Sequence, residues 1–283
     1  MEFFKLVYEC ECEGNLERKF ALFNELYRDF KNGVYDGYIN SLSTSDENKI
    51  KDLQDELKAQ NELKTPSYES FCDVYSLQDL PKIKGDKRAS LLHSVAHIEY
   101  SAIDIALDAT CRFVGLPRQY YADWLEVASD EMRHFGWLCE QMDKLGLKYG
   151  KMPVHNGLFV AMQRTQDSLL DRMALLPRHM EASGLDANLN IRAKMEQNDG
   201  LISVLKHISD EEITHVAKGD KWFKYACAKS GTNPANWLDI VLSYYPRAFA
   251  NSRDIDEISR LKCGFSEDEI KRIKALGAKK EQN

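Results

Sequence analysis

The sequence lacks long apolar runs, because no stretch approaches the roughly 20 consecutive apolar residues of a membrane-spanning helix. Residues 1–14 lack the basic, apolar and small-residue sections of a secretory signal peptide. We therefore expect a cytoplasmic protein without a membrane partner. Basic residues are fewer than acidic ones: the chain has 38 Lys and Arg and 45 Asp and Glu, which gives a formal net charge of −7. A nucleic-acid partner is not expected, because phosphate binding needs a basic surface.

The seven cysteines lack the spacing of a redox or zinc motif, because no two of them form a C-x-x-C pair. Their scatter and odd number indicate reduced thiols rather than a disulfide framework. Cys10 and Cys12 could bind a soft metal, but a surface strand or coil is the better explanation of their spacing. With 43% hydrophobic and 29% charged residues, the 283-residue chain has the composition of a globular protein with a substantial core.

The N-terminal part of the chain shows two helical patterns. Apolar residues recur at helical spacing from Leu16 to Phe30, and a more polar pattern covers residues 46–63. Some of the first ten residues could form a short strand. We expect residues 1–63 to be a helical extension, and residues 64–87, which contain prolines and little periodicity, to be an ordered linker.

Four longer helical segments follow, and their joins are short. Periodicity predicts helices over residues 88–115 and 118–145, a third from about residue 157 that is interrupted at 184–186, and a fourth over 200–230. Long helices with short connections favour an antiparallel bundle. The sequence thus predicts an all-α protein with a four-helix bundle over residues 88–231.

Residues 232–283 are predicted to form a C-terminal helical extension that packs on the bundle. A short helix is expected between Pro234 and Pro246. Ser266 and Glu269 have the spacing of a capping box, which predicts the start of a last helix.

Two Glu-x-x-His pairs, Glu131 with His134 and Glu212 with His215, lie within the long helical patterns. A spacing of three places both side chains of a pair on one helix face, one turn apart, where they can bind one metal ion together. Apolar residues occupy the neighbouring positions of the same face, so both pairs are predicted to point into the core.

Two further glutamates repeat the arrangement. Glu99 precedes Glu131 by 32 residues, and Glu181 precedes Glu212 by 31 residues. Glu99 and His134 are equidistant from the break at residues 116–117, so they should lie level in an antiparallel pair. Glu181 and Glu212 are equidistant from position 196.5, next to a turn sequence. The apolar pattern around Glu181 is weaker than the patterns around the other three glutamates.

Four inward carboxylates need compensation. Burying one isolated carboxylate costs on the order of 20 kcal/mol in the idealised limit, and several kcal/mol in practice. Arg133 and Arg178 are too few to balance them, whereas two divalent cations neutralise all four and leave both imidazoles neutral. The alternative is that some of these side chains face solvent. Oxygen-rich sites with one imidazole per ion favour two iron ions, with manganese also possible.

The stretch from Asp130 to His134 resembles the Asp-Glu-x-Arg-His motif of di-iron oxygenases and ribonucleotide reductase small subunits. Residues 88 to about 270 resemble the bacterial ferritin-like family called domain of unknown function 455. The matching stretches are residues 91–93, 96–99, 130–135, 153–158, 177–181 and 211–216. The resemblance implies a ferritin-like di-metal bundle whose ligands are Glu99, Glu131, His134, Glu181, Glu212 and His215. It also implies that Asp130 hydrogen-bonds His215 and that Glu211 hydrogen-bonds His134.

Four other residues could contact a substrate or support the site. His97 is two residues before Glu99 and should point elsewhere, into core packing or a hydrogen bond. His93 and His155 could line an access route, or His155 could be a surface residue. Arg178 could hold an anionic substrate or act as a charge partner for the carboxylates.

Three functions fit these predictions. The first is an oxygen-activating oxidoreductase, a hydroxylase or oxidase, with dioxygen, an external electron donor and an unidentified small-molecule substrate as partners. The second is an enzyme like the transfer-RNA nucleoside hydroxylases, which the acidic balance disfavours. The third is iron handling or peroxide removal, although the long extensions would crowd a storage shell.

Overall fold

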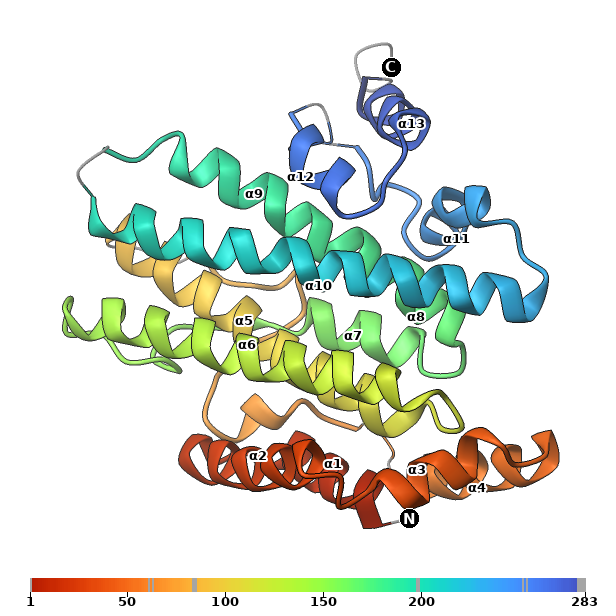
Figure 1. The fold of residues 1–283 in the computed structure, drawn as a ribbon. Coiled ribbons are helices and arrows are strands. Elements are labelled where there is room, and N and C mark those ends of the chain that lie inside the picture. Colours follow the sequence, from red (N-terminus) through yellow and green to blue (C-terminus); the bar gives the residue numbers. More distant parts are fainter. Residues whose placement is uncertain are drawn as a thin grey trace. The chain divides into compact units, whose positions relative to one another are not determined.

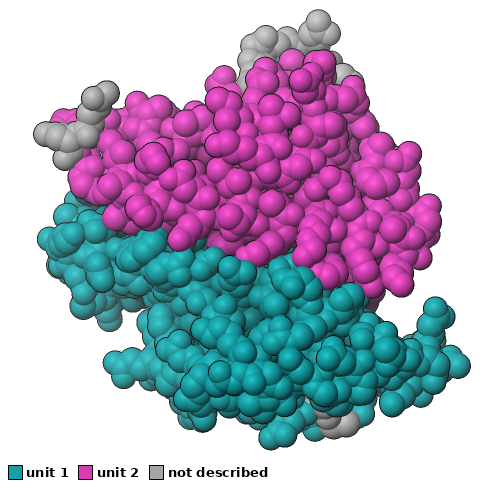
Figure 2. Space-filling model, in the orientation of Figure 1, with its two compact units in different colours: residues 1–163 teal, residues 164–283 magenta. Residues whose placement is uncertain are grey.

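The chain is almost entirely helical, which confirms the all-α prediction (Figure 1). The computed structural model describes residues 2–60, 62, 64–82, 86–196, 199–250, 252 and 254–278. They divide into two compact units, residues 1–163 and 164–283 (Figure 2). The division falls within the range predicted for the bundle. No helix in the described ranges combines the length and apolarity needed to cross a bilayer.

The first residues form a helix, α1 (Glu2–Cys12), so the predicted strand is wrong. Phe3, Phe4, Val7 and Cys10 are all buried, and their spacing of one, three and three suits a helix face rather than the alternation of a strand. The helix packs against α5 (Lys87–Arg112) in the same unit. Contact with a long partner helix therefore decides the conformation of this short segment.

Three more helices complete the N-terminal extension: α2 (Leu16–Lys31), α3 (Asp36–Ser43) and α4 (Glu47–Gln60). The first and last agree with the predicted patterns, and α3 was not predicted. Residues 64–82 contain only a 3₁₀ turn, η1 (Ser67–Ser70), and the two-residue strand β1 (Val74–Tyr75). Strand β1 pairs in parallel with β2 (Val154–His155), which ties this linker to a distant loop of the unit.

Helices α5 and α6 (Arg118–Asp143) form an antiparallel pair joined by residues 113–117. Asp86 caps α5 by accepting hydrogen bonds from two backbone N–H groups of its first turn. The Tyr120 hydroxyl donates to the Ala109 carbonyl near the turn, at 2.9 Å. His134 meets Glu99 farther along the pair, at 3.1 Å. These contacts confirm the prediction that Glu99 and His134 lie at the same height along the antiparallel pair.

The predicted third helix is divided differently. Helix α7 (Gly157–Arg164) ends before residues 165–168, and α8 (Leu169–Leu175), η2 (Leu176–Glu181) and α9 (Ala182–Arg192) then run on without a gap. The interruption predicted at residues 184–186 is wrong, because α9 passes through them. The departure comes earlier, where η2 is a π-helical turn containing Pro177, which has no N–H to donate.

Helix α10 (Gly200–Ser230) packs along α8, η2 and α9. Asp199 caps its start, and Gly231 ends it in the left-handed conformation at φ 69°. Asn188 of α9 donates to the Leu205 carbonyl of α10 at 3.0 Å. These two residues are equidistant from position 196.5, as are Glu181 and Glu212. The predicted register of this antiparallel pair is therefore confirmed.

The C-terminal elements are η3 (Pro234–Asn236), α11 (Trp237–Tyr244), α12 (Glu257–Lys262) and α13 (Glu267–Ala278). The capping box of α13 is present, since Ser266 N donates to Glu269 Oε2 at 2.8 Å and Glu269 N donates to Ser266 Oγ at 3.2 Å. Each compact unit thus contains one antiparallel pair of long helices. Their combination into one four-helix bundle stays a prediction.

Candidate metal centre

Unit 1 gathers three of the predicted ligands. Glu99 of α5 and Glu131 and His134 of α6 are 6%, 1% and 0% exposed. His134 Nδ1 lies 3.1 Å from Glu99 Oε2 and 3.5 Å from Glu131 Oε2. One ligand atom from each residue lies within 4.8 Å of the other two. These three donors are close enough to one another to hold one metal ion together.

This arrangement follows from local structure. The spacing from Glu131 to His134 places both on the α6 face that packs on α5, and the short join between the helices brings Glu99 level with them. Arg133 lies between them in sequence but points outward, with 39% of its side chain exposed. Two carboxylates and one imidazole match the charge and the ligand preference of one divalent cation of iron or manganese type.

Unit 2 holds the second Glu-x-x-His pair on α10. His215 is fully buried, and its Nδ1 lies 3.3 Å from Glu212 Oε1, so this pair shares the geometry of the first. Glu181 is half-buried and is the last residue of the π-helical turn. Among the described residues, Glu181 is not part of any cluster in which three or more ligand atoms lie within 4.8 Å of one another. The π turn changes the helical period, which explains the weak apolar pattern around this residue.

Two acidic neighbours were predicted to support the histidines. Asp130 Oδ1 accepts a hydrogen bond from Arg133 Nη2 at 2.8 Å, on the same helix. Glu211 is half-buried on α10. The pairing of Asp130 with His215 and of Glu211 with His134 stays a prediction.

The three histidines considered as substrate contacts have structural hydrogen bonds in unit 1. His93 Nε2 accepts from the backbone N–H of Gly150 at 3.0 Å. His97 bonds the Tyr149 hydroxyl and the His155 carbonyl, both at 2.8 Å. The His155 ring nitrogen Nδ1 accepts from the N–H of Gly157 at 3.2 Å. Burial lowers the pKa of both His93 and His97 to about 4, which keeps them neutral at pH 7.

Arg178 is 1% exposed and has carboxylate partners inside unit 2. Its Nε donates to Asp220 Oδ1 at 2.9 Å, and its Nη2 donates to Glu269 Oε1 at 2.8 Å. The alternative of a charge partner is therefore better supported than that of a substrate anchor, although the partners are not the predicted metal ligands.

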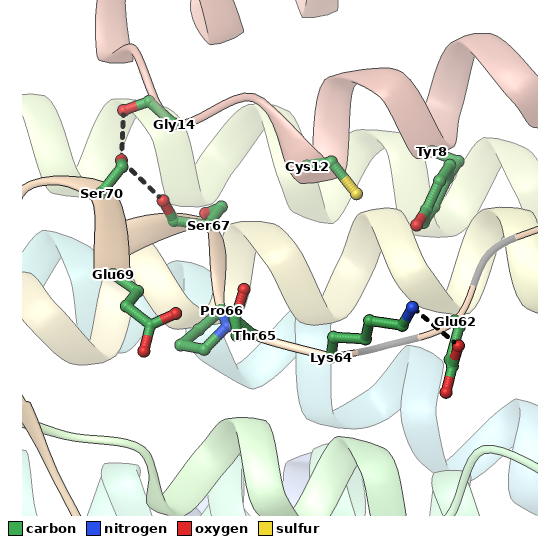
Figure 3. Close-up of a pocket in the computed structure, with 10 residues that line it drawn as sticks. All are labelled: Tyr8, Cys12, Gly14, Glu62, Lys64, Thr65, Pro66, Ser67, Glu69 and Ser70. Carbon is green, nitrogen blue, oxygen red and sulfur yellow. Dashed lines mark hydrogen bonds and ion pairs between the residues drawn. The ribbon is translucent and has the colours of Figure 1, made fainter.

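A pocket of about 490 Å³ in unit 1 is lined in part by Glu62, Lys64 and Ser67, whose hydroxyl has several partners (Figure 3). This hydroxyl donates to Asp104 Oδ2 at 2.6 Å and accepts from Lys19 Nζ at 3.2 Å. The Tyr100 hydroxyl is 2.9 Å away. The Ser67 hydroxyl thus hydrogen-bonds three buried side chains that belong to the interior of unit 1. We therefore assign Ser67 a structural role.

Sequence reasoning missed one buried polar group. Glu11, Asp108 and Cys111 also offer ligand atoms within 4.8 Å of one another. Arg112 lies 2.6 Å from Asp108, and the Cys111 thiol donates to Glu11 at 3.6 Å. Burial raises the pKa of Glu11, and the nearby Asp108 carboxylate adds to the effect. The raised pKa favours the neutral form of Glu11, and Arg112 compensates the charge of Asp108, so this group has charge compensation of its own. Asp104 and Asp108, one turn apart on an apolar helix, were the signal available in the sequence.

Comparison with known proteins agrees with the resemblance to domain of unknown function 455. The family model described as "Protein of unknown function (DUF455)" matches residues 12–271. An uncharacterized protein of Haemophilus influenzae is 34% identical over 191 residues, which cover 64% of this chain. The match spans 66% of the length of that relative. No solved structure matches the chain. Because the family model covers most of its length, this chain belongs to the DUF455 family.

Proposed function

We propose that this chain is a ferritin-like di-iron protein that activates dioxygen to oxidise a small molecule. The observation that supports it most is the buried cluster of Glu99, Glu131 and His134. Two carboxylates beside one imidazole in a protein interior carry a large desolvation cost, and a divalent cation offsets it with matching charge. A set of donors this rich in oxygen suits iron or manganese.

The second half of the proposal is that unit 2 supplies the ligands of a second ion. Glu181, Glu212 and His215 repeat the residue types and the spacing of the first set, and α10 holds its Glu-x-x-His pair in the same geometry. One Glu from each of two helices and one Glu-x-x-His from each of two others is the ligand pattern of di-iron carboxylate bundles. We therefore propose one di-iron centre per chain, built from both sets.

Bound iron of this type would supply reversible oxidation and dioxygen activation. The residues of the chain bind and orient the ions and exclude water. Glu131 and His134, which are 1% and 0% exposed, provide ligands screened from solvent. We propose that Asp130 and Glu211 hydrogen-bond the histidines His215 and His134, which would fix the orientation and basicity of both rings. A function in iron handling would use the same ligands. The number of iron ions that each chain takes up distinguishes the two functions.

The test is metal analysis of the protein loaded anaerobically with ferrous iron. We expect about two ions per chain for the wild type and substantially fewer for Glu131→Ala and for Glu212→Ala. Glu140→Ala, which removes an exposed glutamate from the same α6 helix, should retain the wild-type content. A wild-type content well below one ion per chain, unchanged by Glu131→Ala, would rule out the proposed centre.

A further inference from the structure

Two buried arginines flank Glu181 within unit 2. Arg178 precedes it by three residues in the π turn, and Arg260 pairs with Asp186, five residues after it in α9. Both arginine side chains are 1% exposed. Their partners connect this segment to α10 and to the C-terminal helices. The surroundings of Glu181 are therefore fixed by contacts far from it in the sequence.

Arg178 bridges two elements. Its guanidinium joins Asp220 of α10 to Glu269 in the first turn of α13. Three aromatic rings surround it, with Cζ at 4.4 Å from the ring centre of Trp237, 4.5 Å from that of Phe265 and 5.2 Å from that of Phe223. In such apolar surroundings the ion pairs of Arg178 should stay formed, because loss of a carboxylate partner would leave an uncompensated buried charge.

Arg260 of α12 forms the second bridge. It reaches Asp186 with two nitrogens, Nη2 to Oδ2 at 2.6 Å and Nε to Oδ1 at 3.3 Å. Asp186 Oδ1 also accepts the backbone N–H of Asp256 at 2.7 Å. A forked contact of this kind sets orientation as well as distance. It joins α9 to the start of α12.

The turn between α12 and α13 rests on the ligand-bearing helix itself. The Cys263 thiol donates to the carbonyl of Ile213, the residue after Glu212, at 3.4 Å. Gly264 has φ 99°, and a Cβ there would lie 2.5 Å from Asp220 Oδ2. Only glycine combines this conformation with so close an approach. The C-terminal segment thus contacts α10 beside Glu212 and is tied by ion pairs to the helix of Glu181.

We propose that Arg178 and Arg260 are positioning residues, through which α12 and α13 hold the π turn where Glu181 binds metal. The inference rests on the proposed function, because it takes Glu181 as a ligand. A π turn is rare and occurs mostly as a single turn inside an α-helix, so we expect its geometry to depend on the contacts around it. Ion pairs on both sides of Glu181 provide that support, so the C-terminal extension is part of the metal centre's framework.

The test uses the full chain carrying Glu269→Gln and Asp186→Asn together, which removes charge from both bridges with little change in shape. Anaerobic titration with Co²⁺, followed by ligand-field absorption, measures each binding step. We expect the first ion to bind as in the wild type. The second ion should bind roughly 10–100-fold more weakly and with an altered spectrum. Arg178→Lys, which keeps the charge but loses the fork, should show the same defect.

Glu257→Gln is the matched control, because it removes an exposed ion pair with Lys274 in the same C-terminal segment. Circular dichroism checks that each variant is folded. Wild-type affinity and spectrum for both ions in the folded double variant, with only a lower melting temperature, would overturn the positioning role and leave the di-metal centre intact. A wild-type protein that binds no Co²⁺ would overturn both.

Discussion

His93 is a neutral base buried in α5, and its Nε2 accepts hydrogen bonds from the N–H groups of Gly150 and Met152 at 3.0 and 3.4 Å. Burial lowers its pKa from 6.5 to about 4. The unfolded chain therefore takes up a proton before the folded chain does as the pH falls. The contribution of His93 to stability is complete above pH 6.5 and is lost between pH 6.5 and about 4.

We predict that His93→Gln makes the free energy of unfolding less dependent on pH. Glutamine offers an acceptor oxygen to the same N–H groups but does not titrate. Between pH 7 and pH 5 the decrease in stability should be smaller than in the wild type by about 2 kcal/mol, from the difference between the two pKa values. Urea unfolding at both pH values measures it. His207→Gln, at an exposed position, serves as the control. An unchanged pH dependence in His93→Gln would contradict this account.

The proposed metal ligands show how far single residues could be predicted. The Glu131 and His134 side chains converge as their spacing requires, because residues three apart on a helix share a face. Arg178 and His93 could not be assigned in the same way. The ion-pair partners of Arg178 are 42 and 91 residues away in the sequence. His93 accepts hydrogen bonds from backbone groups 57 and 59 residues away. Nothing in local spacing encodes such contacts.

At the scale of elements, the close approach of α10 to the π turn is the feature most open to test. Gly219 lies one turn after His215, and a Cβ there would be 2.4 Å from Pro177 Cβ. No real pair of carbon atoms comes so close, so the two segments would have to separate. The absence of a side chain at Gly219 lets the π turn lie against α10 one turn after His215.

We predict that Gly219→Ala destabilises the protein by about 1–3 kcal/mol, the usual cost of overpacking. Gly184→Ala is the matched control, because Gly184 also lies inside a helix but has open space around its Cα. That substitution should stabilise by roughly 0.5–1 kcal/mol through helix propensity alone. Urea unfolding of both variants gives the comparison, and equal effects of the two substitutions would contradict the packing argument.

The elements also show where periodicity misleads. Residues 184–186 contain glycine and aspartate, which favour a break, yet α9 continues because Asp186 is held by Arg260 and Leu185 is buried. The π turn at η2 (Leu176–Glu181) was hidden in an ordinary helical pattern. Tertiary contacts overrode local preference at both places.

At the scale of the whole molecule, iron capacity separates an oxygen-activating enzyme from an iron store. We predict that anaerobic titration of the chain with ferrous iron saturates near two ions per chain. Exposure to dioxygen should then oxidise both ions in a single turnover. Because that oxidation delivers only two electrons, repeated turnover should require an added reductant. Absorption spectroscopy and oxygen consumption measure these steps.

Other outcomes point to the alternatives. Uptake of tens of ferric ions per chain, with assembly into a large particle, would favour storage and contradict the enzyme proposal. A ferrous protein that does not react with dioxygen would favour manganese or a site that opens only with substrate.

The sequence by itself determined the helical class, the convergence of Glu99, Glu131 and His134, and the register of both antiparallel pairs. The helical period and the short connections are properties of the local sequence. They place Glu99 opposite His134 and Asn188 opposite Leu205, each pair equidistant from the predicted centre of its turn. Tertiary structure alone decided that α1 is helical, that η2 widens into a π turn and that Arg178 binds Asp220 and Glu269. These outcomes depend on which distant side chains meet in the interior, where burial and charge compensation outweigh local preference.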